Sequence, residues 1–220
     1  EYFDPELTKK IKEYKWPFYF MDFETIQQLV PKIKGTRPYE VIPFQWSIHK
    51  WQSIDKPIEI TDNESFLEFT DKNIERKFIE KLLKVLGTKG TIFSHNAPTE
   101  NSVLKRLKEK ESCKDLSKEI DQILSRVVDT LPLARSYFYN PKMMGQYSIK
   151  KIIKAIPSDV SYEKEGDIAG GMGAQLSWFK CTESNVSKAE IKKQRALLIN
   201  YCANDTFAMY DLIKYWANKN

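Results

Sequence analysis

The sequence predicts an α/β fold with a mixed central β-sheet flanked by α-helices. Short apolar segments rich in aromatic and β-branched residues, typical of buried strands, occupy 18–23, 41–51 and 91–95. Later segments carry apolar residues at every third or fourth position, which indicates amphipathic helices. Because the strands first follow one another and then alternate with helices, we expect antiparallel and parallel pairs in one mixed sheet.

In the first half of the chain, the pattern predicts a polar helix over 5–14, a strand over 18–23 and a loop over 26–39. A second strand over 41–51 and a short third strand over 58–60 follow. Pro43 lies inside the second strand. Proline cannot donate a hydrogen bond to a sheet ladder, so Pro43 suits an edge or a bulge.

In the second half, we expect helices over 74–86, 98–107 and 116–124 and a short helix over 149–153. Strands are expected over 91–95 and 127–129. Gly87 is expected to end the first of these helices, and Asp129 to cap the helix that follows it. A loop is expected over 157–174, because it contains Gly166, Gly170, Gly171 and Gly173. A long helix is predicted from Ser187 to near the C-terminus.

Length and composition narrow the class of protein. The 220 residues suit a single domain spanning 1–220, and 41% hydrophobic residues are enough for a buried core. No apolar run approaches the roughly 20 residues of a membrane-spanning helix, and no signal peptide is visible. Three scattered cysteines without a CxxC pair argue against structural zinc and for a reducing, cytoplasmic setting. The first residue is Glu1 rather than methionine, so we expect a domain excised from a larger protein with further domains.

The first predicted strand is apolar but ends in two acids, Asp22 and Glu24. Strand alternation places both side chains on the same side of the sheet. Two carboxylates a few ångströms apart repel each other, and burying either one without a partner is costly. A divalent cation would resolve both problems. The alternative is a solvated strand end with no ligand.

The last predicted helix brings a further acid to its apolar face. Leu198, Tyr201, Asp205, Ala208 and Leu212 recur at spacings of three or four and therefore share one face. Asp205 thus projects from the stripe that should meet the sheet, and Tyr201 lies one turn before it. The alternatives are a buried acid satisfied by a neighbouring side chain and an ordinary core tyrosine.

Glu100 opens the helix that follows the strand ending at His95, and a strand-to-helix junction directs such a residue to the carboxyl edge of the sheet. A glutamate in a first helical turn is also favourable through the helix dipole alone. Together, the acids offer the oxygen ligands that Mg²⁺ or Mn²⁺ prefers. Two such ions can clamp the attacking and leaving oxygens of a phosphodiester displacement.

These residues resemble the motifs of the DnaQ-like (DEDD) exonuclease superfamily, tyrosine subgroup, which has a ribonuclease H-like fold. The first motif, D-x-E-T, matches Asp22-Phe23-Glu24-Thr25, and the third, Y-x-x-x-D, matches Tyr201 to Asp205. The second motif, H-N-A-x-F-D-x-x-x-L, is similar to His95 to Leu104. Smaller likenesses cover Asp129 to Arg135 and Gln146 to Lys150. The run from Gly35 to His49 resembles an uncharacterised bacterial domain family that often closes a larger protein.

The resemblance implies a role for each acid. Asp22 would bridge two Mg²⁺ or Mn²⁺ ions, Glu24 and Asp205 would complete their shell, and Glu24 would also orient the attacking water. Tyr201 would hold or deprotonate that water, and its ordinary pKa of about 10 favours orientation. Glu100 would take the second-motif acid position, where the family has aspartate. Because Glu100 is one methylene longer, full activity is in question.

Nucleic acid is the expected partner. Single strands bind through aromatic stacking and contacts between cations and phosphates, and the net charge of +5 is compatible with a polyanion. The substrate contacts expected from the residues and the resemblance are Phe23, Thr25, Asn96, Ser148 and Lys150, with Trp46, Tyr147 and Lys151 as further candidates. Phe23 is favoured because it lies between Asp22 and Glu24. Asn96, with His95, is also expected to hold the turn between strand and helix.

The sequence therefore predicts a Mg²⁺- or Mn²⁺-dependent 3′–5′ exonuclease acting on single-stranded or 3′-ended DNA or RNA, with no membrane partner. Three alternatives stay open. The chain could be a catalytically weak nucleic-acid-binding module, which the departures at Thr99 and Glu100 motivate. It could be a ribonuclease H-like interaction scaffold, or an endonuclease.

Overall fold

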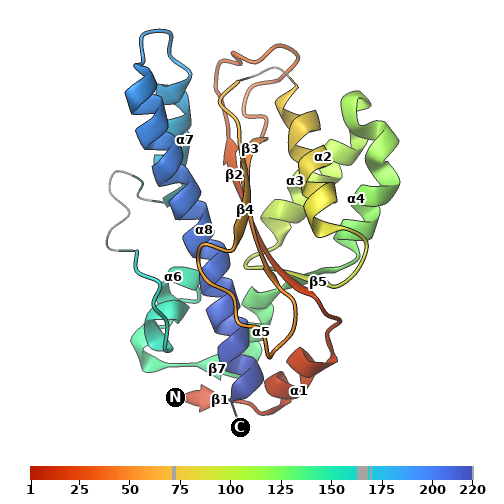
Figure 1. The fold of residues 1–220 in the computed structure, drawn as a ribbon, viewed down its shortest axis with the longest axis vertical. Coiled ribbons are helices and arrows are strands. Elements are labelled where there is room, and N and C mark those ends of the chain that lie inside the picture. Colours follow the sequence, from red (N-terminus) through yellow and green to blue (C-terminus); the bar gives the residue numbers. More distant parts are fainter. Residues whose placement is uncertain (71–72, 163–167, 169, 220) are drawn as a thin grey trace.

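The computed structural model describes residues 1–70, 73–162, 168 and 170–219. In this part of the chain, a central β-sheet stands between two helical layers (Figure 1). α8 and α7 lie along one face of the sheet, and α2, α3 and α4 cover the other. The predicted α/β architecture with a mixed sheet is thereby confirmed.

The strands are β1 (Tyr2–Phe3), β2 (Phe18–Ile26), β3 (Ile42–Trp51), β4 (Asn63–Leu67), β5 (Thr91–Ser94), β6 (Val127–Asp129) and β7 (Phe138–Tyr139). Within the described residues, the central sheet has five strands in the order β4-β3-β2-β5-β6, and β1 pairs with β7 in a separate two-stranded sheet. β2 pairs antiparallel with β3 and parallel with β5, so the strand that carries Asp22 and Glu24 is central.

The α-helices are α1 (Glu6–Glu13), α2 (Ile74–Leu86), α3 (Pro98–Glu109), α4 (Ser117–Leu124), α5 (Thr130–Tyr137), α6 (Ile149–Ile152), α7 (Gly170–Cys181) and α8 (Lys188–Asn218). Short 3₁₀ turns occupy η1 (Glu111–Leu116), η2 (Pro141–Met143) and η3 (Ile153–Ala155). Gly87 ends α2 with a positive φ of 52°, as predicted. None of the helices in the described ranges is both long enough and apolar enough to cross a membrane.

Two predicted segments were wrong. Ile58 to Ile60 is not a strand, and the edge strand instead begins at Asn63, where Phe66 and Leu67 are buried against the sheet. The expected glycine loop is helical from Gly170 onward, because α7 buries Ala174, Ser177 and Trp178 and this packing overrides the weak helix propensity of glycine. Gly166 lies outside the described residues.

A β-bulge interrupts the pairing of β2 with β3. Glu24 pairs with Gln45 but Thr25 pairs with Pro43, so Phe44 is the extra residue. The prediction that Pro43 suits a bulge is therefore confirmed. The bulge lies next to Glu24, at the point where β2 leaves the apolar part of the sheet.

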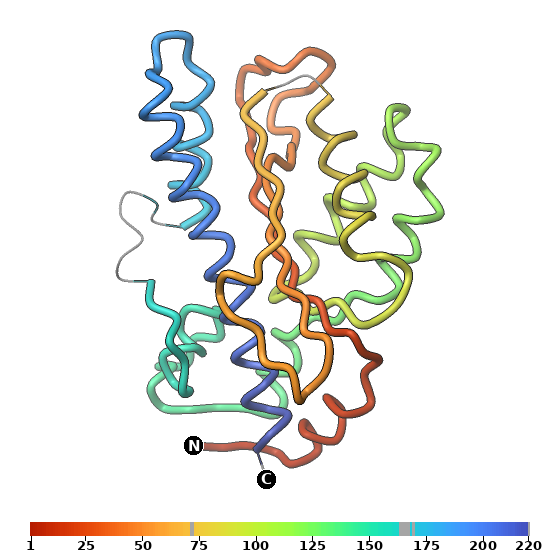
Figure 2. Tube along the Cα trace, viewed as in Figure 1, coloured from red at the N-terminus to blue at the C-terminus, as the bar shows by residue number. Residues whose placement is uncertain are grey.

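The buried core has two clusters, and β2 contributes side chains to both. In Figure 2, the chain of β2 runs between α8 on one side and α2 on the other. Tyr19, Met21 and Phe23 pack with the residues of α2, whereas Phe18 and Phe20 pack with the C-terminal half of α8. Each such aromatic or aliphatic side chain contributes roughly 1.5–3 kcal/mol on full burial. The sheet is therefore held from both sides, and β2 is a rigid base for the acids at its end.

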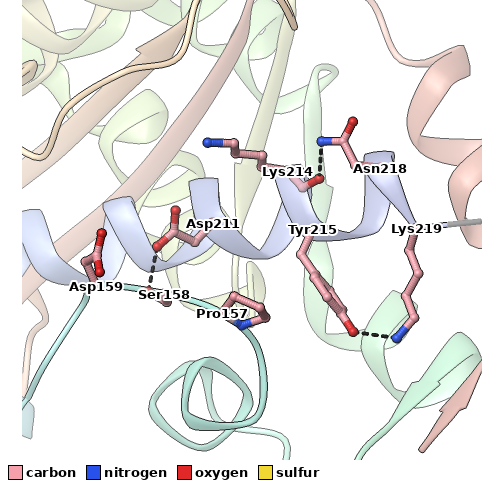
Figure 3. Close-up of a pocket in the computed structure, with 8 residues that line it drawn as sticks. All are labelled: Pro157, Ser158, Asp159, Asp211, Lys214, Tyr215, Asn218 and Lys219. Carbon is pink, nitrogen blue, oxygen red and sulfur yellow. Dashed lines mark hydrogen bonds between the residues drawn. The ribbon is translucent and has the colours of Figure 1, made fainter.

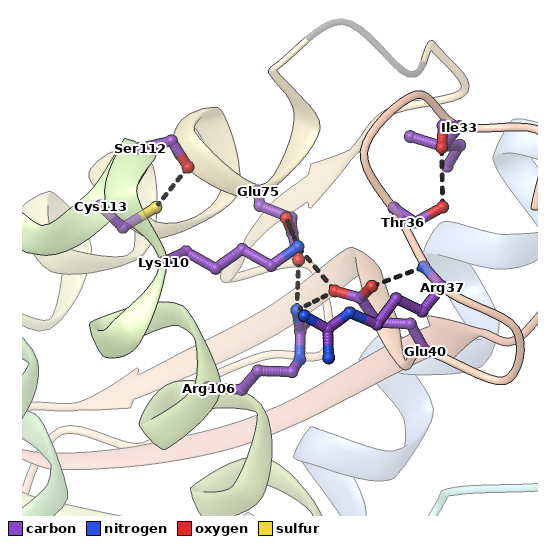
Figure 4. Close-up of polar contacts among 9 residues, drawn as sticks. All are labelled: Ile33, Thr36, Arg37, Glu40, Glu75, Arg106, Lys110, Ser112 and Cys113. Atoms are coloured by element: carbon purple, nitrogen blue, oxygen red, sulfur yellow. Dashed lines mark hydrogen bonds and ion pairs between the residues drawn. The ribbon is translucent and has the colours of Figure 1, made fainter.

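A cluster of ion pairs holds the segment between β2 and β3 against the helices (Figure 4). Arg106 Nη1 lies 3.2 Å from Glu40 Oε1 and 2.7 Å from Glu75 Oε1, and Lys110 Nζ lies 2.7 Å and 2.6 Å from the same two carboxylates. Glu40 belongs to the loop, whereas Arg106 lies on α3 and Lys110 directly follows that helix. This cluster restrains the chain just before it enters β3.

Candidate metal centre

Asp22 and Glu24 point to the same face of β2, which is the face covered by α8. Glu24 is only 7% exposed, and Asp22 is partly buried. The intervening Phe23 points to the opposite face, as strand alternation requires. The predicted placement of the two acids on one side of the sheet is therefore confirmed by the geometry.

Asp205 comes to the same place from the middle of α8. Asp22, Glu24 and Asp205 each offer a carboxylate oxygen, and these oxygens all lie within 4.8 Å of one another. Asp205 is 9% exposed, and the apolar residues on its helical face, Leu198 and Ala208, are fully buried. The prediction that Asp205 lies on the face of the helix that meets the sheet is thus confirmed.

The electrostatics of this cluster favour a cation. The pKa of Asp22 is raised well above its ordinary range, first by burial and then by the negative charges of Asp205 and Glu24. A buried carboxylate normally avoids this cost through a cationic or hydrogen-bonding partner. Because the donors are all carboxylate oxygens, a hard divalent cation such as Mg²⁺ or Mn²⁺ fits the set.

Glu100 lies near this cluster but does not complete it. Its carboxylate contributes to the raised pKa of Asp22, yet it is not among the described acids whose oxygens meet within 4.8 Å. Glu100 is 4% exposed, and within the described residues its Oε2 has no hydrogen-bond partner. Burial raises the pKa of Glu100 to about 7. The fourth predicted acid is therefore a buried carboxyl group beside the cluster.

Tyr201 and Lys150 form a pair next to the acids. Lys150 Nζ lies 3.5 Å from the Tyr201 hydroxyl and 4.4 Å from the centre of its ring. The same amine lies 4.5 Å from the ring centre of Tyr162. Tyr201 is 5% exposed and precedes Asp205 by one helical turn. The structure thus places Tyr201 and Lys150, both predicted from the sequence, in contact.

Cys202 is a site residue that sequence reasoning missed. Its Sγ donates a hydrogen bond to Asp22 Oδ2 at 3.3 Å and lies 3.7 Å from the Asp22 carbonyl oxygen. Burial and the neighbouring acids raise the pKa of this thiol well above its ordinary range, which keeps it protonated as a donor. Its position could have indicated this contact, because Cys202 and Asp205 are three residues apart on α8 and therefore lie close together on the helix surface.

Gly171 was assigned to a loop, but it lies in the first turn of α7, beside Glu24. A Cβ atom placed on Gly171 would be 3.9 Å from Glu24 Oε2. The same helix also meets the end of β2 through Gln175, whose Oε1 accepts a hydrogen bond of 3.4 Å from the Gln27 amide. α7 therefore forms one wall of the acidic centre.

The predicted substrate contacts occupy different environments. Thr25 is partly buried at the end of β2, and Asn96 and Ser148 are exposed. Phe23 is 6% exposed and packs edge-on against Phe78, with 4.9 Å between ring centres. That ring belongs to the core on the face away from Asp22, which corrects the reason for favouring it as a stacking platform.

His95 and Asp129 hold the turns that carry these segments. His95 Nδ1 lies 2.8 Å from Thr130 Oγ1, and its Nε2 lies 2.7 Å from the Tyr147 carbonyl oxygen. Asp129 Oδ1 accepts hydrogen bonds from the Leu131 and Asn96 amides, both at 2.9 Å. The predicted capping role of Asp129 is confirmed, and His95 and Asn96 do form the turn after β5.

One pocket on the described surface lies away from Asp22, Glu24 and Asp205. It has a volume of about 650 Å³ and is formed by the 157–159 segment and the last turns of α8 (Figure 3). Ser158 Oγ donates to Asp211 Oδ2 at 2.5 Å inside it. None of the predicted site residues lines this pocket. A second pocket, of about 490 Å³, is lined by Tyr201, Ala203 and Asn204 on the helix that carries Asp205.

A family model described as "Domain of unknown function (DUF2779)" matches residues 19–148. The match covers more than half of the chain, so the chain belongs to this family. Asp22, Glu24 and Glu100 fall inside the matched segment, whereas Tyr201 and Asp205 follow it. No curated protein and no solved structure matches the chain.

Proposed function

We propose that this member of the family is a metal-dependent 3′–5′ exonuclease with a ribonuclease H-like fold, related to the DnaQ-like superfamily. The observation that carries the proposal is the meeting of Asp22, Glu24 and Asp205 within 4.8 Å, from two elements far apart in sequence. The mixed sheet, with its antiparallel strands followed by parallel ones, is compatible with that fold.

Asp22, Glu24 and Asp205 would hold two Mg²⁺ or Mn²⁺ ions, with Glu100 as the neighbouring acid. When bound, such ions stabilise charge on a phosphoryl group and lower the pKa of a water molecule. A bound cation would stabilise the ionised form of Asp22, because burial and repulsion by the neighbouring acids raise the pKa of this residue. The Cys202 thiol fixes the orientation of the Asp22 carboxylate through its hydrogen bond.

Tyr201 would orient the attacking water, and Lys150 would contact the phosphate or the Tyr201 hydroxyl. The 3.5 Å contact between Lys150 Nζ and that hydroxyl supports both roles. A cation beside phosphate is a common means of positioning a nucleic-acid strand. Thr25, Asn96 and Ser148 lie at the ends of the elements around the centre and would contact the sugar-phosphate backbone.

The test is degradation of a 3′-labelled and a 5′-labelled single strand of DNA and of RNA in Mn²⁺. We expect stepwise loss from the 3′ end by the wild-type chain and none by Asp22→Asn or Asp205→Asn. Asp211→Asn is a matched control, because Asp211 lies on the same helix but bonds to Ser158, away from the acids. Equal degradation by Asp205→Asn and wild type would exclude the proposal.

A catalytically weak binding module is the second candidate function, and the placement of Glu100 outside the acidic cluster favours it. This candidate predicts salt-sensitive binding of a single strand with no degradation in Mn²⁺. An interaction scaffold predicts neither binding nor degradation. Cleavage of a circular single strand would instead identify an endonuclease.

A further inference from the structure

The face of β3 that meets α8 carries a row of buried polar side chains. Gln45, Ser47 and His49 alternate along the strand, and all are 0% exposed. Apolar residues would normally fill such positions, since each buried polar group must find a hydrogen-bond partner. The row lies directly beside the acids, because Ser47 pairs with Asp22, and Gln45 with Glu24, across the β2–β3 ladder.

The row contacts α8 at the turns on either side of Tyr201. Gln45 Nε2 donates to the Leu198 carbonyl oxygen at 2.7 Å. Thr206 Oγ1 lies 2.8 Å from Ser47 Oγ and 2.8 Å from His49 Nδ1, and Thr206 is 0% exposed. The docking of this part of α8 on the sheet is therefore polar and directional.

One direction of hydrogen bonding satisfies the whole chain of groups. The Ile60 carbonyl oxygen, 3.0 Å from His49 Nε2, can only accept, so Nε2 carries the proton. Burial lowers the pKa of His49 and keeps the ring neutral, so Nδ1 accepts from the Thr206 hydroxyl, which shares its single proton with the Ala203 carbonyl oxygen 3.0 Å away. Thr206 then accepts from Ser47, and Ser47 accepts from Asn63 Nδ2 at 2.6 Å.

This chain of hydrogen bonds links the two halves of the acidic centre. Thr206 follows Asp205 on α8, and Ser47 faces Asp22 on the neighbouring strand. The carboxylates of Asp22 and Asp205 repel each other. Apolar packing alone resists sliding of a helix only weakly, whereas hydrogen bonds depend on distance and angle.

We propose that Thr206, together with Ser47 and His49, is a positioning device that sets the distance between Asp205 and the acids of β2. The device holds the ligand atoms close together in the absence of a cation and so preorganises the site for one. This inference rests on the proposed metal-binding function. It predicts that the hydroxyl of Thr206 controls metal affinity although it does not touch the metal.

The test compares Mn²⁺ binding and thermal unfolding in variants of the 220-residue chain. Thr206→Val removes the hydroxyl and keeps the shape, and we expect Mn²⁺ affinity to fall by about tenfold or more in titration calorimetry, as for other residues that orient metal ligands. Thr206→Ser keeps the hydroxyl and should restore affinity to within about threefold of wild type. If Thr206→Val does not fold, Ser47→Ala, which removes the donor to Thr206, decides the question in the same way.

Thr8→Val is the matched control, because it makes the same change on a hydroxyl that also anchors α8. Thr8 Oγ1 donates to the carbonyl oxygens of Trp216 and Lys219, at the far end of the helix from Asp205. We expect this variant to unfold at a lower temperature but to bind Mn²⁺ like wild type. If Thr206→Val also binds Mn²⁺ like wild type, the positioning role is overturned. If the wild-type chain itself binds no Mn²⁺, the proposed function fails, and the inference fails with it.

Discussion

The two faces of the central sheet differ in the kind of side chain that they bury. Toward α2, the middle of β2 and β3 presents apolar side chains, among them Met21, Phe23, Trp46 and Ile48, all at most 6% exposed. Toward α8, β2 is apolar at Phe18 and Phe20 and acidic from Asp22 onward, and β3 carries the polar row of Gln45, Ser47 and His49. Both faces are buried, so the difference is not one of exposure to water.

Buried apolar area stabilises a fold without requiring exact geometry, whereas buried polar groups stabilise only when every partner is in place. The α2 face is therefore packed for stability, whereas the α8 face combines an apolar cluster around the C-terminal half of α8 with a polar patch around Asp22 and Ser47. The comparison teaches that the candidate metal ligands gather at the buried polar patch and not in the apolar packing on the other face.

The strongest way to break this comparison is to damage the apolar face. Phe78 is 0% exposed and packs edge-on against Phe23 and Phe66. Phe78→Ala should lower the free energy of unfolding by about 3–5 kcal/mol, the usual cost of a large cavity. Chemical denaturation measures this loss. Mn²⁺ affinity should stay unchanged while the chain is folded, and a parallel loss of affinity would show that the faces are not separate.

Adding metal should act on the polar face alone. Mn²⁺ at about 100 times its dissociation constant should stabilise the wild-type chain by about 2.7 kcal/mol, because it binds the folded state and relieves the repulsion at Asp22. Asp205→Asn should show little of this gain in the same thermal unfolding experiment. Similar stabilisation of both proteins would mean that Mn²⁺ binds elsewhere on the chain.

The smallest expected effect is a pH dependence that isolates Glu100. Its pKa is about 7 in the folded chain, above the ordinary 4.5, so folding takes up a proton between these values. In the absence of metal, the stability of wild type relative to Glu100→Gln should therefore be greatest below pH 4.5 and decline as the pH rises through about 7. The titration of His49 and His95 occurs in both proteins and therefore cancels in the difference between their stabilities. Urea unfolding of the pair at several pH values measures the difference, and a pH-independent difference would contradict the buried acid.

The sequence was sufficient to predict the acids but not their surroundings. Asp22, Glu24 and Asp205 were predictable because strand and helix periodicities assign a face to each residue. Their closeness in space had to come from the structure, since periodicity gives no distance between β2 and α8. Cys202 was missed because a cysteine on a helical face usually fills a core.

The fold was predictable where local pattern decides and not where tertiary packing does. The helix at α2 and the bulge at Pro43 follow from spacing and from the chemistry of proline. The edge strand β4 was placed too early because Ile58 to Ile60 has the stronger apolar pattern. α7 begins in a glycine run, and only its packing reveals a helix.

The acidic centre is split along the sequence, because Asp205 on α8 follows Asp22 on β2 by 183 residues. Ribosomes deliver the chain from the N-terminus, and a domain folds as a unit once enough of it has emerged. β2 and its two carboxylates are thus made long before α8 can cover them. On the proposed function, a polypeptide interrupted before α8 would carry no complete site, so a hydrolytic activity directed at nucleic acid would begin only after α8 has been made.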